Sequence, residues 1–176
     1  KTNKCNEKGI RLIHIFEDEW IYKKEIWKSM LRNIFGKTEN RIFARKCEIR
    51  EVDSQTACLF LEDNHIQGKC GSSIRYGLYY NDELVSLMTF GKTRHFIGNG
   101  SHEYELLRFC NKLNTNVVGG ASKLFKHFVD TNKPNNIVSY ADRRWSNGRL
   151  YDVLGFTLYN ISDPNYYYVI DNKRRN

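Results

Sequence analysis

The alternation of apolar and polar residues along the chain predicts strands and helices in mixed order. Short apolar or alternating runs, typical of strands, occupy residues 11–16, 47–52, 74–80, 83–90, 104–110, 137–141, 157–161 and 166–170. Apolar residues at helical spacing occupy residues 20–34, 53–63, 122–129 and 148–154. This order predicts an α+β fold in which helices flank a mixed sheet.

Local signals mark where these elements begin and end. Asp53 or Ser54 can cap a helix, and Gly36 and Gly155 are typical helix ends. Asn81-Asp82 between two alternating runs predicts a hairpin. Residues 41–46 are basic and predict a linker, and the basic tail at residues 173–175 is expected to fray.

The most informative stretch is residues 103–156, and within it the segment Val117–Leu124. Gly119 and Gly120 lie where an apolar strand gives way to a helix. Such a turn leaves backbone N–H groups free at the helix N-terminus, where they can hold a phosphate or another anion. An ordinary strand-to-helix loop is the alternative interpretation.

Composition adds a bias towards polyanionic partners. Hydrophobic residues make up 40% of the 176 residues and aromatic residues 14%, which indicates a folded protein. The net charge of +8 favours a nucleic acid as partner, with a solvated basic surface as the alternative. Lys92, Arg94 and His95, in a Gly-rich loop, are candidates to touch phosphate.

The five cysteines are widely spaced and form no C-x-x-C pair, which argues against a disulfide framework or a zinc site. A reducing cytosol fits this pattern. No apolar run approaches the length that spans a bilayer, so a membrane partner is not expected. The chain begins with Lys1 and not with Met, which favours a piece of a longer protein.

Three segments occur in a characteristic order: Glu105–Phe109, Gly119–Leu124 and Asn147–Phe156. They resemble the core of the GNAT acyltransferase family, in which a Gly-rich loop holds the pyrophosphate of acyl-CoA. The resemblance implies a GNAT-like, mostly antiparallel mixed sheet and acetyl-CoA or a related acyl-CoA as cofactor. The implied cofactor-binding residues are Val118, Gly119, Gly120, Ala121, Ser122, Lys123 and Asn147.

A second set of motifs comprises Asn64-His65, Glu105-Leu106-Leu107-Arg108, Ser122, Ser139-Tyr140-Ala141-Asp142 and Tyr151. Over residues 47–170 this set resembles the Mom-like branch found in phages, which modifies adenine in DNA. The resemblance implies DNA as partner, a phage-encoded protein acting in the host cytoplasm, and a set of catalytic residues. These residues are Arg108, Asp142, Tyr151 and His65.

Each of these residues also has a structural interpretation. Arg108, inside an apolar strand, needs an acceptor and is either a structural partner of Asp142 or Glu105 or an anchor for substrate or cofactor. Asp142 either caps the next turn or serves a ligand at the end of its strand. Tyr151 is a core residue or, as in GNAT-like enzymes, the proton donor to the leaving thiolate. Ser122 and His65 can simply cap and end helices.

The N-terminal segment Asn6–Trp20, with the basic helix after it, resembles the last strand and helix of the Vsr-like nuclease domain in phage homing endonucleases of the Hef-like group. The acidic residues Glu17, Asp18 and Glu19 suit a helix N-terminus, with metal ligation as the alternative. The metal-binding and catalytic residues of that nuclease family lie upstream of this strand, so no metal site is expected. The predicted division is a nuclease remnant at residues 1–40 and a GNAT/Mom-like domain at residues 41–176.

These resemblances lead to three functional hypotheses. The first is an enzyme that transfers an acyl-derived group to a DNA base, which must be flipped or single-stranded to be reached. The second is a catalytically inactive module that targets a homing endonuclease to DNA through Lys and Arg contacts. The third is an inactive fragment of a protein that cuts DNA.

Overall fold

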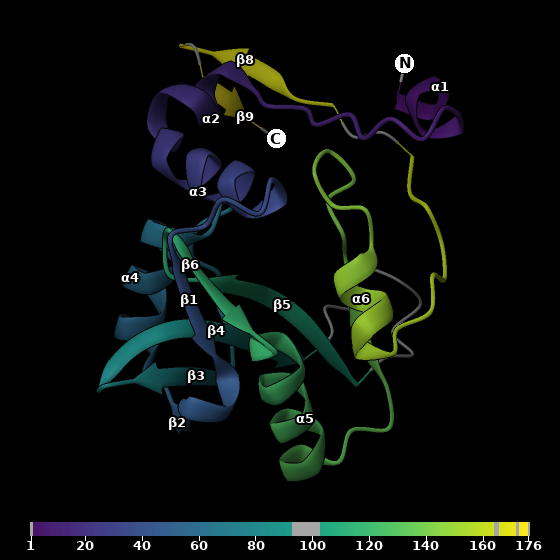
Figure 1. Ribbon diagram of the computed structural model, residues 1–176. Coiled ribbons are helices and arrows are strands. Elements are labelled where there is room, and N and C mark those ends of the chain that lie inside the picture. The colour runs from purple at the N-terminus through teal and green to yellow at the C-terminus, as the bar shows by residue number, and fades with distance from the viewer. Residues whose placement is uncertain (1, 93–102, 164–165, 172, 176) are drawn as a thin grey trace. The chain divides into compact units, whose positions relative to one another are not determined.

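The computed structural model describes residues 2–92, 103–163, 166–171 and 173–175 (Figure 1). Contacts divide the chain into two compact units. The larger unit is Glu25–Tyr140, and the smaller unit combines Lys1–Lys24 with Ala141–Asn176. The predicted division into a nuclease remnant at residues 1–40 and a GNAT/Mom-like domain at residues 41–176 concerns family resemblance and not compactness, and it stays a prediction.

A five-stranded sheet forms the centre of the larger unit. Its strands are β2 (Glu48–Glu51), β3 (Ile74–Tyr80), β4 (Glu83–Lys92), β5 (Tyr104–Asn111) and β7 (Ile137–Ser139), in the order β2-β3-β4-β5-β7. Neighbouring strands are antiparallel except β5 and β7, which are parallel. The predicted α+β class, with a mixed and mostly antiparallel sheet, is therefore confirmed.

Two further strands form a separate parallel pair, β1 (Asn40–Phe43) with β6 (Thr115–Val118). A 3-10 turn, η1 (Ala44–Lys46), follows β1 directly. The prediction of a basic linker at residues 41–46 was therefore wrong. Ile42 pairs with Val117 in the register, so the strand depends on a partner more than 70 residues away that local composition does not reveal.

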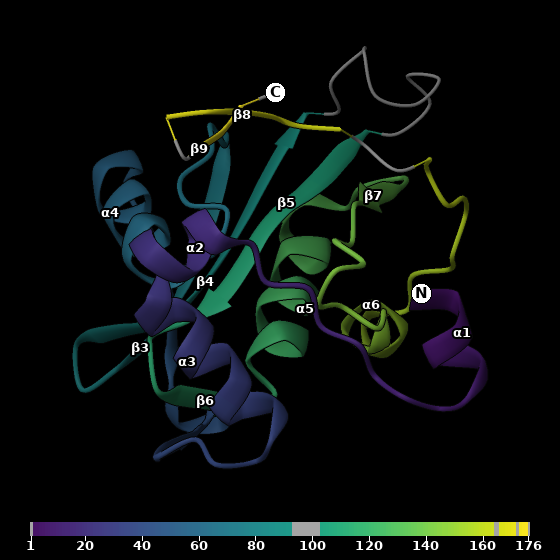
Figure 2. The same ribbon diagram turned by 90° about the horizontal axis from the view of Figure 1, so that it is seen from above.

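Helices cover both faces of the five-stranded sheet (Figures 1 and 2). These helices are α4 (Ser54–Asn64) and α5 (Gly120–Asn132), and a further helix, α3 (Lys24–Ile34), precedes β1. Leu87 of β4 packs in a buried cluster with Ala57 and Leu61 of α4. Phe90, three residues along β4 and therefore on the other face, stacks on Phe128 of α5 with ring centroids 3.6 Å apart.

The local signals in the sequence hold in the structure. The Asp53 side chain accepts a hydrogen bond from the Thr56 N–H and caps α4. Asn81 and Asp82 both have positive φ, at 50° and 61°, as a tight hairpin turn between β3 and β4 requires. Gly36 has a φ of 66° just beyond the end of α3.

The smaller unit contains α1 (Thr2–Glu7), α2 (Glu17–Tyr22), α6 (Arg149–Leu154) and the antiparallel pair β8 (Tyr168–Ile170) and β9 (Lys173–Arg175). The strand predicted at residues 11–16 is absent from this described stretch. The N–H of His14 bonds to the carbonyl of Arg144 instead of to a neighbouring strand. The terminal hairpin also lies later than predicted, because the tail expected to fray forms β9.

Cys5, Cys47, Cys58, Cys70 and Cys110 are all free thiols. Within the described residues, no helix has the length and apolarity needed to cross a membrane.

Replacing Phe128 with Ala should destabilise the larger unit by about 3–5 kcal/mol, because it leaves a cavity beside Phe90. Phe35→Ala is the matched control, since Phe35 is 69% exposed and its loss should change the free energy of unfolding by less than about 0.5 kcal/mol. Urea unfolding measures both values. Equal losses for the two variants would contradict this account of the core.

Candidate functional site

A sharp turn connects β6 to α5 in the larger unit. Gly119 is the N-cap residue, with φ 77° and ψ 6°, and no side chain caps the helix. The N–H of Lys123 makes the first helical hydrogen bond, 3.0 Å to the Gly119 carbonyl. The N–H groups of Gly120, Ala121 and Ser122 therefore lack intrahelical acceptors, and the positive end of the helix dipole lies at this turn.

Backbone conformation explains the first glycine of the turn, and close packing explains the second. The positive φ of Gly119 disfavours a side chain there. A Cβ on the buried Gly120 would lie 3.1 Å from Val117 Cγ1 and 3.4 Å from Leu78 Cδ1. The turn thus packs closely on β6 and β3, while Ser122 in the first turn of α5 is exposed.

Lys123, predicted to bind the cofactor, makes internal hydrogen bonds. Its Nζ donates to the carbonyl oxygens of Ala44 at 3.0 Å and Cys47 at 2.6 Å, at the two ends of η1. Burial raises the pKa of the Cys47 thiol, and the nearby Lys123 ammonium partly opposes that rise. The positive charge of Lys123 is therefore directed at the backbone of η1.

A β-bulge gives β5 an unusual pair of adjacent side chains. Thr89 pairs with Arg108 and Phe90 pairs with Leu106, so Leu107 is an extra residue in β5. Leu107 and Arg108 consequently line the same pocket of about 380 Å³. The other lining residues are Cys70, Gly71, Ser72, Ser73, Gly91 and Lys92.

Arg108 has unused hydrogen-bonding capacity at this pocket. Its Nη1 donates to the Leu107 carbonyl at 2.8 Å. Its Nε is buried and has no hydrogen-bond partner among the described residues. Because buried donors are normally paired, Arg108 can bind an anionic or carbonyl group of a ligand here.

Arg108 and the glycine turn lie on opposite faces of the sheet. Arg108 shares the face of Cys110, which packs with the cluster beneath α4. Gly120 packs beside Leu78 at the start of α5, which covers the other face (Figure 2). The structure therefore does not bring these two predicted sites together.

The outer edge of β5 is open over most of its length. β7 pairs only with Tyr104, Glu105 and Leu106. Within the described part of the chain, no strand pairs on that side with residues 107–111. The backbone of this edge can accept a ligand that carries amide groups, as an added strand would.

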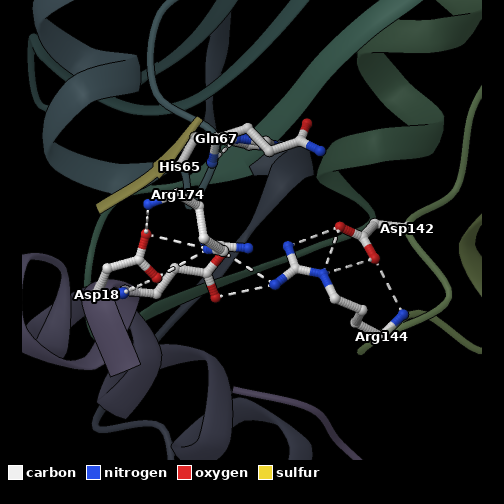
Figure 3. Close-up of polar contacts among 7 residues, drawn as sticks. Asp18, His65, Gln67, Asp142, Arg144 and Arg174 are labelled. Atoms are coloured by element: carbon white, nitrogen blue, oxygen red, sulfur yellow. Dashed lines mark hydrogen bonds and ion pairs between the residues drawn. The ribbon is translucent and has the colours of Figure 1, made fainter. Parts of the chain in front are cut away.

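His65, predicted to be catalytic, is the C-cap residue of α4. Its Nδ1 accepts a hydrogen bond from the Gln67 N–H at 3.1 Å (Figure 3). The adjacent Asn64 accepts from the Leu113 N–H at 2.7 Å and so holds the turn between β5 and β6. The helix-ending role that the sequence offers for His65 is confirmed, and a catalytic role stays a prediction.

In the smaller unit, Asp142 belongs to a network of five charged residues, which also includes Asp18, Glu19, Arg144 and Arg174 (Figure 3). Its two carboxylate oxygens accept from the Arg144 guanidinium at 2.8–3.1 Å, and Oδ1 also accepts from the Arg144 N–H. Arg144 also bonds to both oxygens of Glu19 at 2.9 and 3.0 Å. Arg174 of β9 bonds to Glu19 and Asp18 of α2.

The network is well shielded from solvent and organised around Phe16. The side chains of Glu19, Arg174 and Arg144 are 10%, 17% and 20% exposed. The guanidinium carbons of Arg174 and Arg144 lie 3.8 and 4.7 Å from the centroid of the Phe16 ring. Asp142 caps the turn that follows it by accepting from the Arg144 N–H, which is the structural role that the sequence offered, and its catalytic role stays a prediction.

Sequence reasoning missed Arg144 and Arg174. The signal available was weak, namely basic residues at 143–144 and 173–175 and the acidic run Glu17–Glu19 far from both in sequence. Pairing over more than 120 residues leaves no local pattern.

The remaining predicted residues of this unit lie around α6. Tyr151 is half-buried in α6, and its ring meets Phe156 edge to face with centroids 5.8 Å apart. Asn147 is exposed just before α6, and its Oδ1 accepts from the Arg149 N–H at 3.4 Å. Their predicted roles as proton donor and cofactor ligand stay predictions.

The residues of the Gly-rich loop that were predicted to touch phosphate are Lys92, Arg94 and His95. Arg94 and His95 lie outside the described residues, whereas Lys92 ends β4 at the pocket of Arg108.

In the ranges that the structure describes, no three His, Cys, Asp or Glu side chains gather as metal ligands.

Comparison with known proteins gives a structural similarity and no sequence match. No protein-family model matches the chain, and no curated protein sequence matches it. Among solved structures, the chain is similar to the ribosomal-protein-alanine N-acetyltransferase from Brucella melitensis biovar Abortus 2308, at 13% identity and a TM-score of 0.47. The match covers 69% of this chain and 99% of that chain.

Replacing Arg144 with Ala should destabilise the smaller unit by about 3 kcal/mol, because Asp142 is left shielded from water without its partner and Glu19 keeps only Arg174. Arg143→Ala is the matched control, since Arg143 is the adjacent and exposed arginine. Hydrogen exchange at α2 and thermal unfolding measure the difference. Similar protection of α2 in both variants would refute the role given to Arg144.

Acid should weaken the same network. Burial would raise the pKa of Asp18, but hydrogen bonds from Arg174 outweigh it and hold that pKa below its ordinary value. A carboxyl with a lowered pKa stabilises the fold above its unfolded pKa of about 3.9, and the gain is lost as the pH falls through the folded pKa. Exchange protection of α2 should therefore fall below about pH 4 in the native chain and respond less to acid in Arg174→Gln. An equal acid response in both proteins would contradict this.

Proposed function

We propose that the chain is a DNA-acting protein of the phage type whose GNAT/Mom-like domain binds an acyl-CoA and transfers its acyl-derived group to a DNA base. The observation that carries the proposal is the uncapped start of α5, where Gly119 lies in the left-handed conformation and the first-turn N–H groups are free of intrahelical acceptors. This geometry suits a pyrophosphate.

The open edge of β5 supports the same ligand class. A CoA arm carries amide groups, and the backbone at residues 107–111 has no strand partner on its outer side among the described residues. Amides of the arm can pair with this edge. The net charge of +8 favours both a phosphorylated cofactor and DNA.

The proposed reaction is a simple acyl transfer. The amine nitrogen of the base attacks the thioester carbonyl carbon, a C–N bond forms, and the C–S bond breaks. The amine loses one proton to solvent or a base, and the leaving thiolate takes one from a general acid, the role that the GNAT resemblance implies for Tyr151. The Mom-like resemblance makes Arg108, Asp142 and His65 the other residues to test by substitution.

A second candidate function is a DNA-targeting module without transfer activity. It is favoured by the engagement of two predicted site residues in internal contacts. Lys123 donates to the η1 backbone, and both oxygens of Asp142 accept from Arg144. Such a module would bind DNA through Lys and Arg, with an affinity that falls steeply with salt.

Acetyl-CoA should bind the purified chain, and Ser122→Glu should weaken that binding at least about tenfold. Ser122 is exposed in the first turn of α5, where a carboxylate repels a phosphate while favouring the helix dipole. Ser122→Gln is the matched neutral control and should bind nearly as the native chain does. Isothermal titration calorimetry measures affinity, and thermal unfolding shows that both variants stay folded.

The outcomes separate the two candidates. Absence of binding at millimolar acetyl-CoA would remove the acyltransferase and leave the targeting module. Binding that is equally strong in Ser122→Glu would place the ligand away from α5. Incubation with acetyl-CoA and single-stranded DNA, followed by mass spectrometry of the nucleosides, tests transfer itself.

A further inference from the structure

A basic surface with one aromatic residue lies beside the glycine turn in the larger unit. We call it the Arg-Phe surface, and it consists of Arg41, Phe43, Arg45 and Lys46 on β1 and η1. All four side chains are exposed, and Phe43 is 37% exposed. An exposed aromatic residue between basic side chains is a common composition for nucleic-acid contacts.

The geometry of β1 explains why these side chains lie together. Ile42 points inwards opposite the buried Val117, so Arg41 and Phe43 share the outer face of the strand. The guanidinium carbons of Arg41 and Arg45 lie 5.4 and 5.0 Å from the centroid of the Phe43 ring.

Among the residues that the structure describes, no carboxylate neutralises the basic side chains of this surface. Within the described residues, no ion pair involves Arg41, Arg45 or Lys46. Arg50, just beyond, differs because it pairs with Glu48 and Asp82. The three positive charges of the Arg-Phe surface thus remain available to phosphate groups.

The backbone beneath the surface is held in place. Phe43 pairs with Val118 in the parallel register of β1 and β6. Lys123 holds both ends of η1 through the Ala44 and Cys47 carbonyls. A preorganised surface of this kind spends little conformational entropy on binding.

We infer that the Arg-Phe surface binds unpaired nucleic acid, with a base stacked on Phe43 and the flanking phosphates on Arg41, Arg45 and Lys46. Cation–π contacts are weak at exposed sites, so an incoming base can displace a guanidinium towards a phosphate. An unpaired strand is required because the bases of a duplex have no exposed face for stacking. The inference rests on the proposed DNA partner and deepens it by naming the surface and the form of the strand.

Fluorescence anisotropy with a labelled single-stranded DNA of about 16 nucleotides tests the inference. Phe43→Ala should weaken binding by about 5- to 150-fold, the loss expected when one base-stacking aromatic is removed. Phe43→Trp should retain the affinity. Phe35→Ala is the matched control, because Phe35 is also exposed but lies outside the surface.

The salt dependence of binding tests the phosphate contacts of the basic side chains separately. Arg41→Gln and Arg45→Gln should each weaken binding and lower the slope of log affinity against log salt by about 0.7. Lys126→Gln is the control, since Lys126 is an exposed lysine of α5 that pairs with Asp130. An unchanged slope in both arginine variants would overturn the phosphate contacts.

The remaining outcomes also decide the matter. Equal affinity of Phe43→Ala and the native chain would overturn the inference, as would equally good competition by a poly-glutamate peptide, which would identify an acidic protein as the partner. Binding to duplex DNA alone would refute the role of the Arg-Phe surface in binding unpaired strands, but it would still agree with DNA as the partner in the proposed function. Absence of binding to either form would overturn both, while acetyl-CoA titration still reports on the cofactor part independently.

Discussion

The hydrogen bonds of Lys123 connect three parts of the larger unit that matter for its function. The ammonium group lies at the first turn of α5 and donates to the carbonyls of Ala44 and Cys47. It thereby holds η1 against the glycine turn, and through η1 it positions the end of β1. A shielded ammonium without acceptors is costly, so these carbonyls and the lysine stabilise one another.

This constraint changes what the glycine turn can do. With Lys123 directed at η1, the proposed anion at the turn would be held by the backbone N–H groups of α5 and by the helix dipole alone. The same hydrogen bonds keep Arg41, Phe43 and Arg45 next to that turn. The groups available to anions are therefore the N–H groups of α5 and the basic side chains of β1 and η1. The charge of Lys123 itself is directed at the η1 carbonyls.

Short-range signals in the sequence predicted the elements well. Asp53 caps α4, Asn81-Asp82 makes the hairpin turn, and Gly119-Gly120 begins α5, because each depends on the backbone preferences of a few adjacent residues. Features that depend on distant partners were mispredicted. Local composition predicts a linker where β1 lies, and it predicts a strand at residues 11–16, whose apolar side chains find no neighbouring strand in the described chain.

The candidate site follows the same rule, because its local features could be predicted and its long-range contacts could not. The glycine turn and Arg108 stood out from local sequence, since a Gly-Gly before a helix and an arginine in an apolar strand are unusual in themselves. Their placement on opposite faces depends on the bulge at Leu107 and on which helix covers each face, and neither has a local signature. The partners of Asp142 and Lys123 were likewise hidden by long sequence separation.

Net charge alone does not locate a binding surface, because many of the arginines are used internally. Arg144 and Arg174 neutralise carboxylates in the smaller unit, and Arg75 donates to the carbonyls of Val52 and Ser72. Such groups contribute little to the attraction of a polyanion, since their field is cancelled or directed at the backbone. The charges that remain effective are those without an acidic neighbour, and on β1 and η1 they surround an exposed aromatic ring. The excess of basic residues therefore becomes informative only when each one is assigned its partner.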